Sequence, residues 1–311
     1  MENYDRLEEL VAAIYSMPRS PTAEDFATML GFVEPTESTR LFANLDEVSK
    51  LLAVCHLLRR LRMMLSERDQ DIIYNKLAAS HLPALVNNFL DAPLPPTTIY
   101  PDESKRSEFR LNNVYLEILG TISHTPYLSK FLRSHKAAAE GGKRLLKTIA
   151  ERVVELAPSW DKKMLNPPLD REPGYYESAA GTAIQMISTL SAAFVKESVD
   201  SPILIAQETK QALIVWLRKW ERRHASEFLG RVSERTRSQL ERRDRLMQDA
   251  NRIRRMLKNW DRCGYIGCNK DSDLKACARC HTVRYCCPEH QRAHWNDRDN
   301  PHKKFCFQAD Y

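Results

Sequence analysis

Cysteine is distributed unevenly along this chain of 311 residues, and that distribution limits what the chain can fold into. Seven of the eight cysteines lie between Cys263 and Cys306, and Cys55 is the single cysteine before them. A disulfide framework is typical of small secreted domains, whereas the opening sequence MENYDRLEEL is acidic and lacks the apolar core of a secretory signal. We therefore expect an intracellular protein, in the nucleus or the cytoplasm, whose clustered cysteines bind metal.

The cysteine-rich segment contains four pairs of metal-binding residues, namely Cys263-x4-Cys268, Cys277-x2-Cys280, Cys286-x3-His290 and His302-x3-Cys306. Eight thiolate and imidazole donors are enough for two tetrahedral zinc sites. Each pair is close enough in sequence to hold one edge of a site, so each zinc takes two pairs. Spacing alone does not decide whether the pairs are used in sequence or interleaved. Cys287 adjoins Cys286 and is an alternative ligand.

The segment CARCHTVRYC, followed by HQRAHW and HKKFC, closely resembles the MYND finger. The usual pattern of that family is two CxxC pairs, a Tyr-Cys, a Cys-Gln four residues on, a His-Trp, then His-Lys and a last cysteine. In the family the pairs interleave. The resemblance therefore implies one zinc held by Cys263, Cys268, Cys286 and His290, and a second zinc held by Cys277, Cys280, His302 and Cys306.

Three features depart from the usual MYND pattern within residues 263–306. The first pair has four intervening residues instead of two, His290 stands where the family usually has cysteine, and WNDRDNPH is a longer spacer before His302. None of these removes a ligand, because histidine binds zinc as well as cysteine does. In the family pattern the ligand is the cysteine directly after the tyrosine, which favours Cys286 over Cys287. We expect His281 and His294 to pack beside the sites and not to bind zinc.

Residues 1–260 predict a mainly α, multi-helical structure, because apolar residues recur at helical spacing and we find no period-2 strand of useful length. The expected helices cover residues 4–17, 22–29, 45–65, a pair within 72–90 broken near Pro83, 112–123, 127–139, 143–156, 177–196, 203–224 and 231–260. On the helix at 45–65 we expect Cys55 to be a buried small apolar residue. The cadence of helix pairs resembles an armadillo or HEAT-type stack, and an irregular helical bundle is the alternative.

Proline-rich and basic stretches predict the domain organisation. We expect a helical domain at 1–225 with a sub-boundary at the 91–101 linker, a long basic connecting helix at 226–260, and the finger at 261–311. A second proline-marked loop is expected at 158–173. The uncharged stretch from Ser178 to Val195 has the length of a membrane span, but its polar residues favour a buried or half-buried helix, and we expect no membrane partner.

Charge and metal geometry limit the expected function. Residues 218–258 hold fourteen Lys and Arg against six Asp and Glu, which is typical of a solvated helix face and leaves nucleic-acid binding as an alternative.

Eight donors fill both zinc sites, so we expect the zinc to be structural and the chain not to be an enzyme. A SET-type methyltransferase relative is the less favoured alternative, since we find no NHxC-like motif. The resemblance implies an adaptor that docks proline-containing segments of partner proteins, with roles such as transcriptional regulation or ubiquitin-ligase recruitment.

Overall fold

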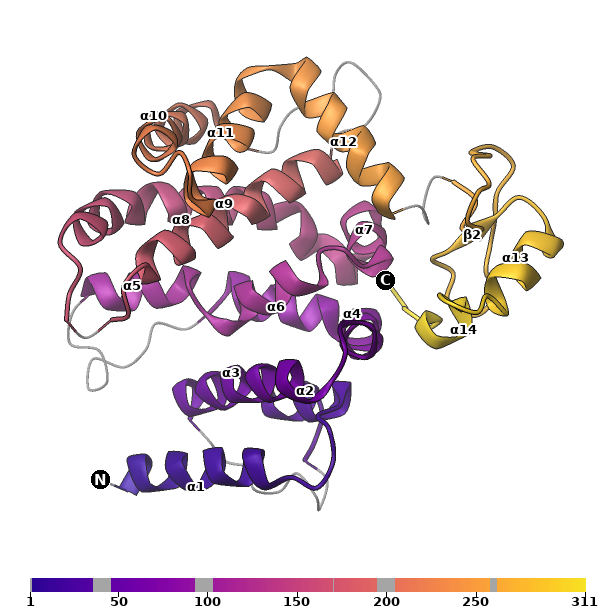
Figure 1. The fold of residues 1–311 in the computed structure, drawn as a ribbon, viewed down its shortest axis with the longest axis horizontal. Coiled ribbons are helices and arrows are strands. Elements are labelled where there is room, and N and C mark those ends of the chain that lie inside the picture. The colour runs from indigo at the N-terminus through magenta and orange to yellow at the C-terminus, as the bar shows by residue number, and fades with distance from the viewer. Residues whose placement is uncertain (1, 36–45, 93–102, 170, 195–204, 258–261) are drawn as a thin grey trace. The chain divides into compact units, whose positions relative to one another are not determined.

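The computed structural model describes residues 2–35, 46–92, 103–169, 171–194, 205–257 and 262–311. Helices account for nearly all of its regular structure before the finger (Figure 1): α1 (Glu2–Ser16), α2 (Ala23–Met29), α3 (Glu47–Met64), α4 (Glu67–Leu90), α5 (Glu103–Leu111), α6 (Val114–Ile122), α7 (Pro126–Arg133), the 3-10 turn η2 (Ala137–Ala139), α8 (Glu140–Leu165), α9 (Tyr175–Phe194), α10 (Gln207–Arg223), α11 (Phe228–Glu241) and α12 (Arg243–Leu257). The mainly α fold class predicted from the sequence is confirmed.

The finger contains the strands β1 (Lys275–Ala276) and β2 (Arg284–Tyr285), followed by the short helices α13 (Pro288–Trp295) and α14 (His302–Phe305). Within the ranges described above, none of the helices combines the length and the apolar character that crossing a bilayer requires. The uncharged stretch that begins at Ser178 lies in α9, where Ala180, Ile184 and Ile187 are buried.

The chain divides into two compact units. The first consists of residues 1–84, 124–128 and 259–310, and the second of residues 85–123, 129–258 and Tyr311. The boundaries expected at 225/226 and 260/261 stay predictions.

In the first unit, α2 begins at a capping box. The Thr22 hydroxyl accepts a hydrogen bond from the Asp25 amide at 3.3 Å, and the Asp25 carboxylate accepts one from the Thr22 amide at 2.8 Å. The Arg19 guanidinium donates to both carboxylate oxygens of Asp25, at 2.6 and 2.8 Å. Burial raises the pKa of Asp25, but these hydrogen bonds and the Arg19 charge together lower it below its usual range.

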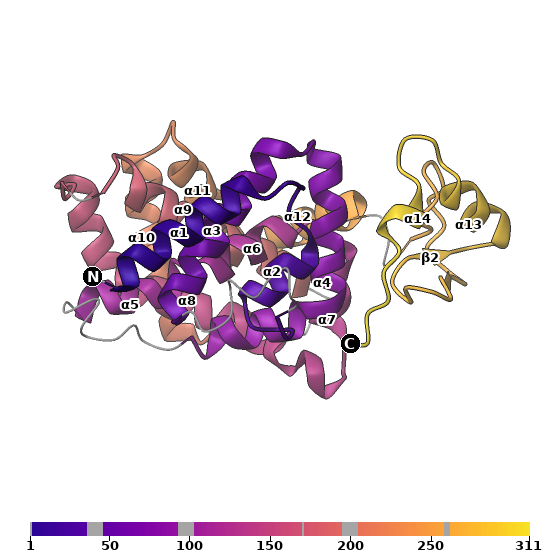
Figure 2. The same cartoon turned by 90° about the horizontal axis from the view of Figure 1, so that it is seen from below.

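Helices α1 and α3 lie side by side in the first unit (Figure 2). Arg60 of α3 is buried, and its guanidinium donates hydrogen bonds to the carbonyl oxygens of Tyr15, Met17 and Arg19. The last carbonyls of a helix have no partner within the helix, so a cation at this end satisfies them and is attracted by the negative end of the helix dipole. Arg60 therefore fixes the end of α1 against α3.

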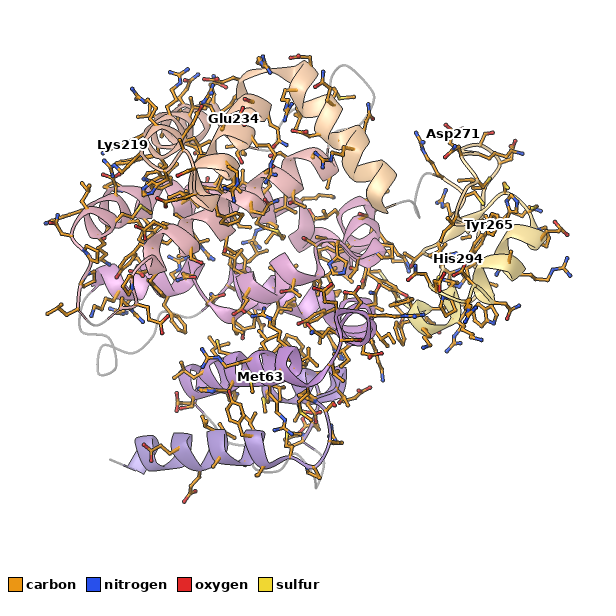
Figure 3. All side chains as sticks on the ribbon, in the orientation of Figure 1. Met63, Lys219, Glu234, Tyr265, Asp271 and His294 are labelled. Atoms are coloured by element: carbon orange, nitrogen blue, oxygen red, sulfur yellow. The ribbon has the colours of Figure 1, made fainter. Side chains whose placement is uncertain are left out.

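The prediction that Cys55 is buried is wrong. On α3, Leu51, Leu58 and Leu61 are buried, but Cys55 is exposed. Met63 of the same helix is also exposed, at 73% (Figure 3). The other buried residues of α3 are Ala53, Val54, Leu57 and Arg60. Apolar spacing gives no sign of a buried charged residue such as Arg60, so the side of α3 that is buried cannot be predicted from that spacing alone.

In the second unit, α8, α9, α10 and α11 pack against one another (Figure 1). Trp160 of α8 and Trp220 of α10 are fully buried between these helices. Gly230 permits the tight turn from α10 into α11, because a Cβ at this position would lie 1.9 Å from the His224 carbonyl oxygen. The core of the unit is thus built from helix faces alone.

Three helix boundaries predicted from proline, or from its absence, are wrong. Helix α4 continues through Pro83, and α8 continues through Pro158 to Leu165. In place of one helix at 231–260, the structure has α11 and α12, separated by Arg242 with an extended backbone at φ −126° and ψ 115°. Helix α5 was not predicted, and most of the expected linker at 91–101 lies outside the described residues.

Candidate metal centre

The β1–β2 hairpin holds the second cysteine pair. The two strands are antiparallel, with Lys275 opposite Tyr285, and the chain turns between them through Cys277 and Cys280. The amide of Cys277 donates to the Val283 carbonyl at 2.8 Å. His281 has a φ of +52° and its amide donates to the Cys277 carbonyl at 2.9 Å, which closes a tight turn. This backbone turns both thiol groups toward the same side.

The first cysteine pair is held by a longer loop that is anchored to the hairpin. The Gly264 amide donates to the Arg284 carbonyl at 2.8 Å, and the Cys268 amide donates to the Tyr265 carbonyl at 3.1 Å. Gly267 has a φ of +89°, a backbone conformation that side-chain-bearing residues rarely adopt. The two additional residues of this pair are therefore accommodated by a glycine turn directly before Cys268.

The third pair lies at the start of α13. Cys286 directly follows β2, Cys287 is the N-cap residue of α13, and Pro288 occupies the first turn. The fixed φ of proline suits this position, which needs no amide donor. The helix places His290 so that its Nδ1 atom lies 3.1 Å from the Cys286 sulfur.

The structure brings the eight predicted donor residues into two groups, in each of which the ligand atoms lie within 4.8 Å of one another. One group is Cys263, Cys268, Cys286 and His290, and the other is Cys277, Cys280, His302 and Cys306. We call these the first and second clusters. The four pairs therefore interleave, which spacing alone had left undecided. Cys287 belongs to neither cluster.

The distances within both clusters fit tetrahedral zinc. With Zn–S bonds of about 2.3 Å and Zn–N bonds of about 2.0 Å, two sulfurs lie about 3.8 Å apart and a sulfur and a nitrogen about 3.5 Å apart. The sulfurs of Cys268 and Cys286 are 3.8 Å apart, as are those of Cys277 and Cys306. The Cys280 sulfur is 3.6 Å from Nε2 of His302.

The Cys263 sulfur lies 3.5 Å from Nδ1 of His290, which also fits. The 3.1 Å distance between the Cys286 sulfur and His290 is shorter than the ideal value. Each cluster supplies three cysteines and one histidine, a donor set that suits zinc. The two histidines use different ring nitrogens.

Burial distinguishes the two clusters. All four residues of the second cluster are buried, whereas Cys268, Cys286 and His290 of the first cluster are partly accessible. The small apolar core of the finger consists of the buried residues Val283 and Tyr285, with Tyr265, Leu274 and Trp295 packed at its edge. The ring of Tyr265 stacks on that of His290 at 4.6 Å between centroids, with 21° between the ring planes.

Two buried groups beside the second cluster form a hydrogen-bonded pair. The Tyr285 hydroxyl lies 3.0 Å from Nδ1 of His294. Burial is the main cause that lowers the pKa of His294, to about 4, while burial and the neighbouring cysteines raise the pKa of Tyr285. His294 is therefore neutral near pH 7, and the tyrosine hydroxyl donates to it.

The expectation that both other histidines pack beside the sites is right for His294 and wrong for His281. His294, labelled in Figure 3, is buried with its ring 5.4 Å from that of His302, and it is outside both clusters. His281 is exposed and also outside both clusters.

Sequence reasoning missed one residue that contacts this region. Tyr127 of α7 belongs to the same unit as the finger, and its hydroxyl is hydrogen-bonded to the backbone on both sides of Cys306. Nothing near Tyr127 in the sequence indicates a metal site, because the contact joins positions 178 to 180 residues apart.

Comparison with known families agrees with this geometry. The family described as the MYND finger matches residues 262–306. Together with the two donor clusters, this match identifies the segment as a MYND-type zinc finger. Such fingers are in general protein-interaction modules. Searches of curated proteins and of solved structures gave no match. The class of the protein is therefore a helical chain that carries a two-zinc MYND finger.

Proposed function

We propose that this protein is a non-enzymatic adaptor, whose finger docks short proline-containing segments of partner proteins. The observation that carries the proposal is the closure of both clusters, each with four protein donors. A catalytic zinc keeps one position for water or substrate, whereas four protein ligands fill a tetrahedral site. The zinc ions then serve to fold the finger and so to form its binding surface. A domain this small needs metal to fold because it buries little apolar area.

The surface of the finger offers suitable side chains for such a peptide. Ile266 is 48% exposed and follows the half-buried ring of Tyr265, which Figure 3 labels. Proline-rich segments adopt an extended helix before binding, so they lose little entropy when they dock on aromatic and apolar side chains. The identity of the segment decides whether the adaptor acts in transcription or with a ubiquitin ligase, and in the nucleus or the cytoplasm.

The basic stretch at 218–258 gives less support to nucleic-acid binding, because many of its charges are already engaged. Ion pairs there join Lys219 and Arg223 to Asp161, Arg218 and Arg237 to Glu241, Arg237 to Glu221, and Arg245 to Asp249. Arg235 is turned inward, toward Gln185 and Ser188 of α9. Phosphate binding needs accessible cations, so we favour the adaptor.

Peptide binding by the zinc-loaded full chain tests the proposal. A panel of fluorescent peptides with one to three prolines is compared by anisotropy with the same peptides carrying alanine instead. We expect binding in roughly the micromolar range that weakens at least about tenfold without proline. Ile266→Asp should abolish binding while two zinc ions remain, and Arg298→Ala, another exposed position of the finger, should leave it unchanged.

Two results would contradict the proposal. One is that no peptide of the panel binds. The other is that a bound peptide is retained equally by Ile266→Asp, by the alanine versions and by chelator-treated protein, which would place binding outside the finger.

A further inference from the structure

The hydroxyl of Tyr127 holds the chain on both sides of the last zinc ligand, Cys306. It lies 2.8 Å from the carbonyl oxygens of Phe305 and Phe307, and the Phe307 amide donates to it at 2.8 Å. A tyrosine hydroxyl has one hydrogen and can also accept, so it satisfies the amide and shares its hydrogen between the two carbonyls. Both flanks of Cys306 are thereby fixed by one side chain of α7.

The Tyr127 side chain is buried, and the hydrogen bonds that its hydroxyl makes are part-buried. Tyr127 and Cys306 each expose 1% of their surface, and Ala309 farther along the chain exposes 5%. Burial is the main reason that the pKa of Tyr127 is raised, so the hydroxyl keeps its hydrogen. If the contact were lost, the Phe307 amide and two carbonyls would need other partners in a half-buried region.

The ring of Tyr311 is packed against aromatic and basic side chains. In the second unit, the Tyr311 ring packs edge-on against Phe131, at 5.3 Å between ring centroids, and lies 5.8 Å from the Lys130 ammonium. Tyr311 exposes 4% of its surface. Aromatic pairs of this geometry are favourable beyond the area that they bury. The Tyr311 ring is therefore packed within the second unit.

We propose that Tyr127 is a positioning residue for the second zinc cluster, and that zinc binding there and docking of residues 305–307 on α7 are one linked equilibrium. Cys306 is one of the four ligands of this cluster. The Tyr127 hydroxyl holds the backbone on both sides of Cys306, and so restricts where its sulfur can lie. Residues that orient metal ligands without touching the metal affect its affinity by about 10- to 100-fold. Linkage is reciprocal, so zinc must stabilise the contact on α7 by the same factor.

The inference goes beyond peptide docking and is independent of it, since it concerns how the finger is held and not what it binds. Zinc binding at the first cluster should not depend on Tyr127. The hydrogen bonds of its hydroxyl go to Phe305 and Phe307, which are the neighbours of Cys306 in the second cluster. The two clusters have the same donor set and should differ in how firmly they hold zinc.

Zinc-release kinetics of the full chain test the proposal. Protein with two zinc ions is mixed with excess chelator and a zinc indicator. The Tyr127→Phe variant should release one of its two zinc ions about tenfold faster than the wild type and the other at an unchanged rate. Hydrogen exchange should show which site releases zinc faster. In the Tyr127→Phe variant, residues 302–311 should be less protected than in the wild type, and residues 263–270 should be protected equally.

Tyr115→Phe is the matched control. Tyr115 is buried in α6, exposes 1% of its surface, and its hydroxyl accepts a hydrogen bond from Asn88 at 3.5 Å in the second unit. Loss of this hydroxyl should leave both zinc-release rates as in the wild type. A further measurement needs no variant, since removal of zinc from the wild type should raise exchange at residues 124–128, which include Tyr127.

The proposal is overturned if Tyr127→Phe releases both ions at the wild-type rate. It is also overturned if both ions leave faster by the same factor, because that pattern reports general loss of stability. Unchanged exchange at residues 124–128 after zinc removal from the wild type would equally show that the two events are not linked.

Discussion

The indole N–H of Trp220 donates a hydrogen bond of 3.1 Å to the carboxylate of Asp161, which joins α10 to α8 inside the second unit. The same carboxylate accepts hydrogen bonds of 2.7 Å from Lys219, labelled in Figure 3, and from Arg223. Asp161 is buried, so its charge is tolerated only because these cations balance it.

Asp161→Asn should lower the free energy of unfolding by about 2 kcal/mol, because two cations lose their partner while the side-chain shape is kept. Urea unfolding followed by helix ellipticity measures the change. Glu151→Gln on the same helix removes an exposed pair with Lys147 and should change stability by less than about 0.5 kcal/mol. Equal effects of the two variants would contradict the prediction.

The contribution of Asp161 should disappear in acid. Burial raises its pKa, but the Lys219 hydrogen bond and the two cations lower it more, so the pKa lies below the usual value. A carboxylate with a lowered folded pKa stabilises the protein above its unfolded pKa, and this stability is lost as pH falls through the folded value. The stability gap between wild type and Asp161→Asn should therefore be full at pH 7 and shrink below about pH 4. A constant gap from pH 7 to pH 3 would contradict this assignment.

Arg152 of α8 should be more important for stability than an ordinary surface arginine. Its guanidinium donates to the carbonyls of Phe89, Leu90 and Arg110, at 2.9, 2.7 and 2.8 Å, and so satisfies the ends of α4 and α5. Burial lowers its pKa to about 10, so the side chain stays charged at pH 7. Arg152→Met should cost about 3 kcal/mol, since the carbonyls are left buried without a partner.

Arg144→Met is the control for this change on the same helix. Arg144 is 60% exposed and pairs with Asp91 at 3.7 Å, so its loss should cost less than about 0.5 kcal/mol in thermal or urea unfolding. A small effect of both variants would contradict the prediction, because it would show that water replaces Arg152 at the carbonyls of Phe89, Leu90 and Arg110.

Much of the fold follows from the sequence, and the errors have identifiable causes. The helix expected at 22–29 agrees with α2, whose start is fixed locally by the Thr22 cap. The sequence predicts that helices end near Pro83 and Pro158, yet both prolines lie inside helices whose neighbouring residues are buried. Packing can offset the roughly 3 kcal/mol that an internal proline costs, and local patterns do not contain that information.

The candidate site was predictable to a different extent. The donor types and spacings of the finger are local, and they identified all eight residues of the two clusters. The interleaved grouping came from the family resemblance, because each pair could join either neighbour. Tyr127 could not be predicted, since its contact with Phe307 depends on how distant parts of the chain fold together.

The two adjacent cysteines offer a sharp test of the ligand assignment. Cys286→Ser should reduce the zinc content from two ions to one per chain, because its sulfur is one corner of the first cluster. Cys287→Ser should keep two ions, since Cys287 is the N-cap residue of α13 and lies outside both clusters. Native mass spectrometry distinguishes these outcomes, and loss of an ion from Cys287→Ser alone would reverse the assignment.

Chelation should unfold the finger and leave most helices intact. Without zinc, the small core around Tyr285 buries too little apolar surface to stay folded. Residues 263–306 should lose protection from hydrogen exchange, while helix ellipticity falls only slightly, because α13 and α14 are the short helices of the finger. Two zinc ions should be released per chain, and a stoichiometry of one or none would contradict the two-cluster assignment.

The interleaving of the clusters has a consequence for how the finger is made. The donors of the first cluster are all present once His290 has been synthesised, whereas the second cluster lacks a donor until Cys306 has been added. The order of the donors along the chain therefore completes one set of ligands before the other. The more accessible cluster can take up its ion first and draw Cys286 to Cys263, which brings the hairpin between them into place before the buried cluster closes.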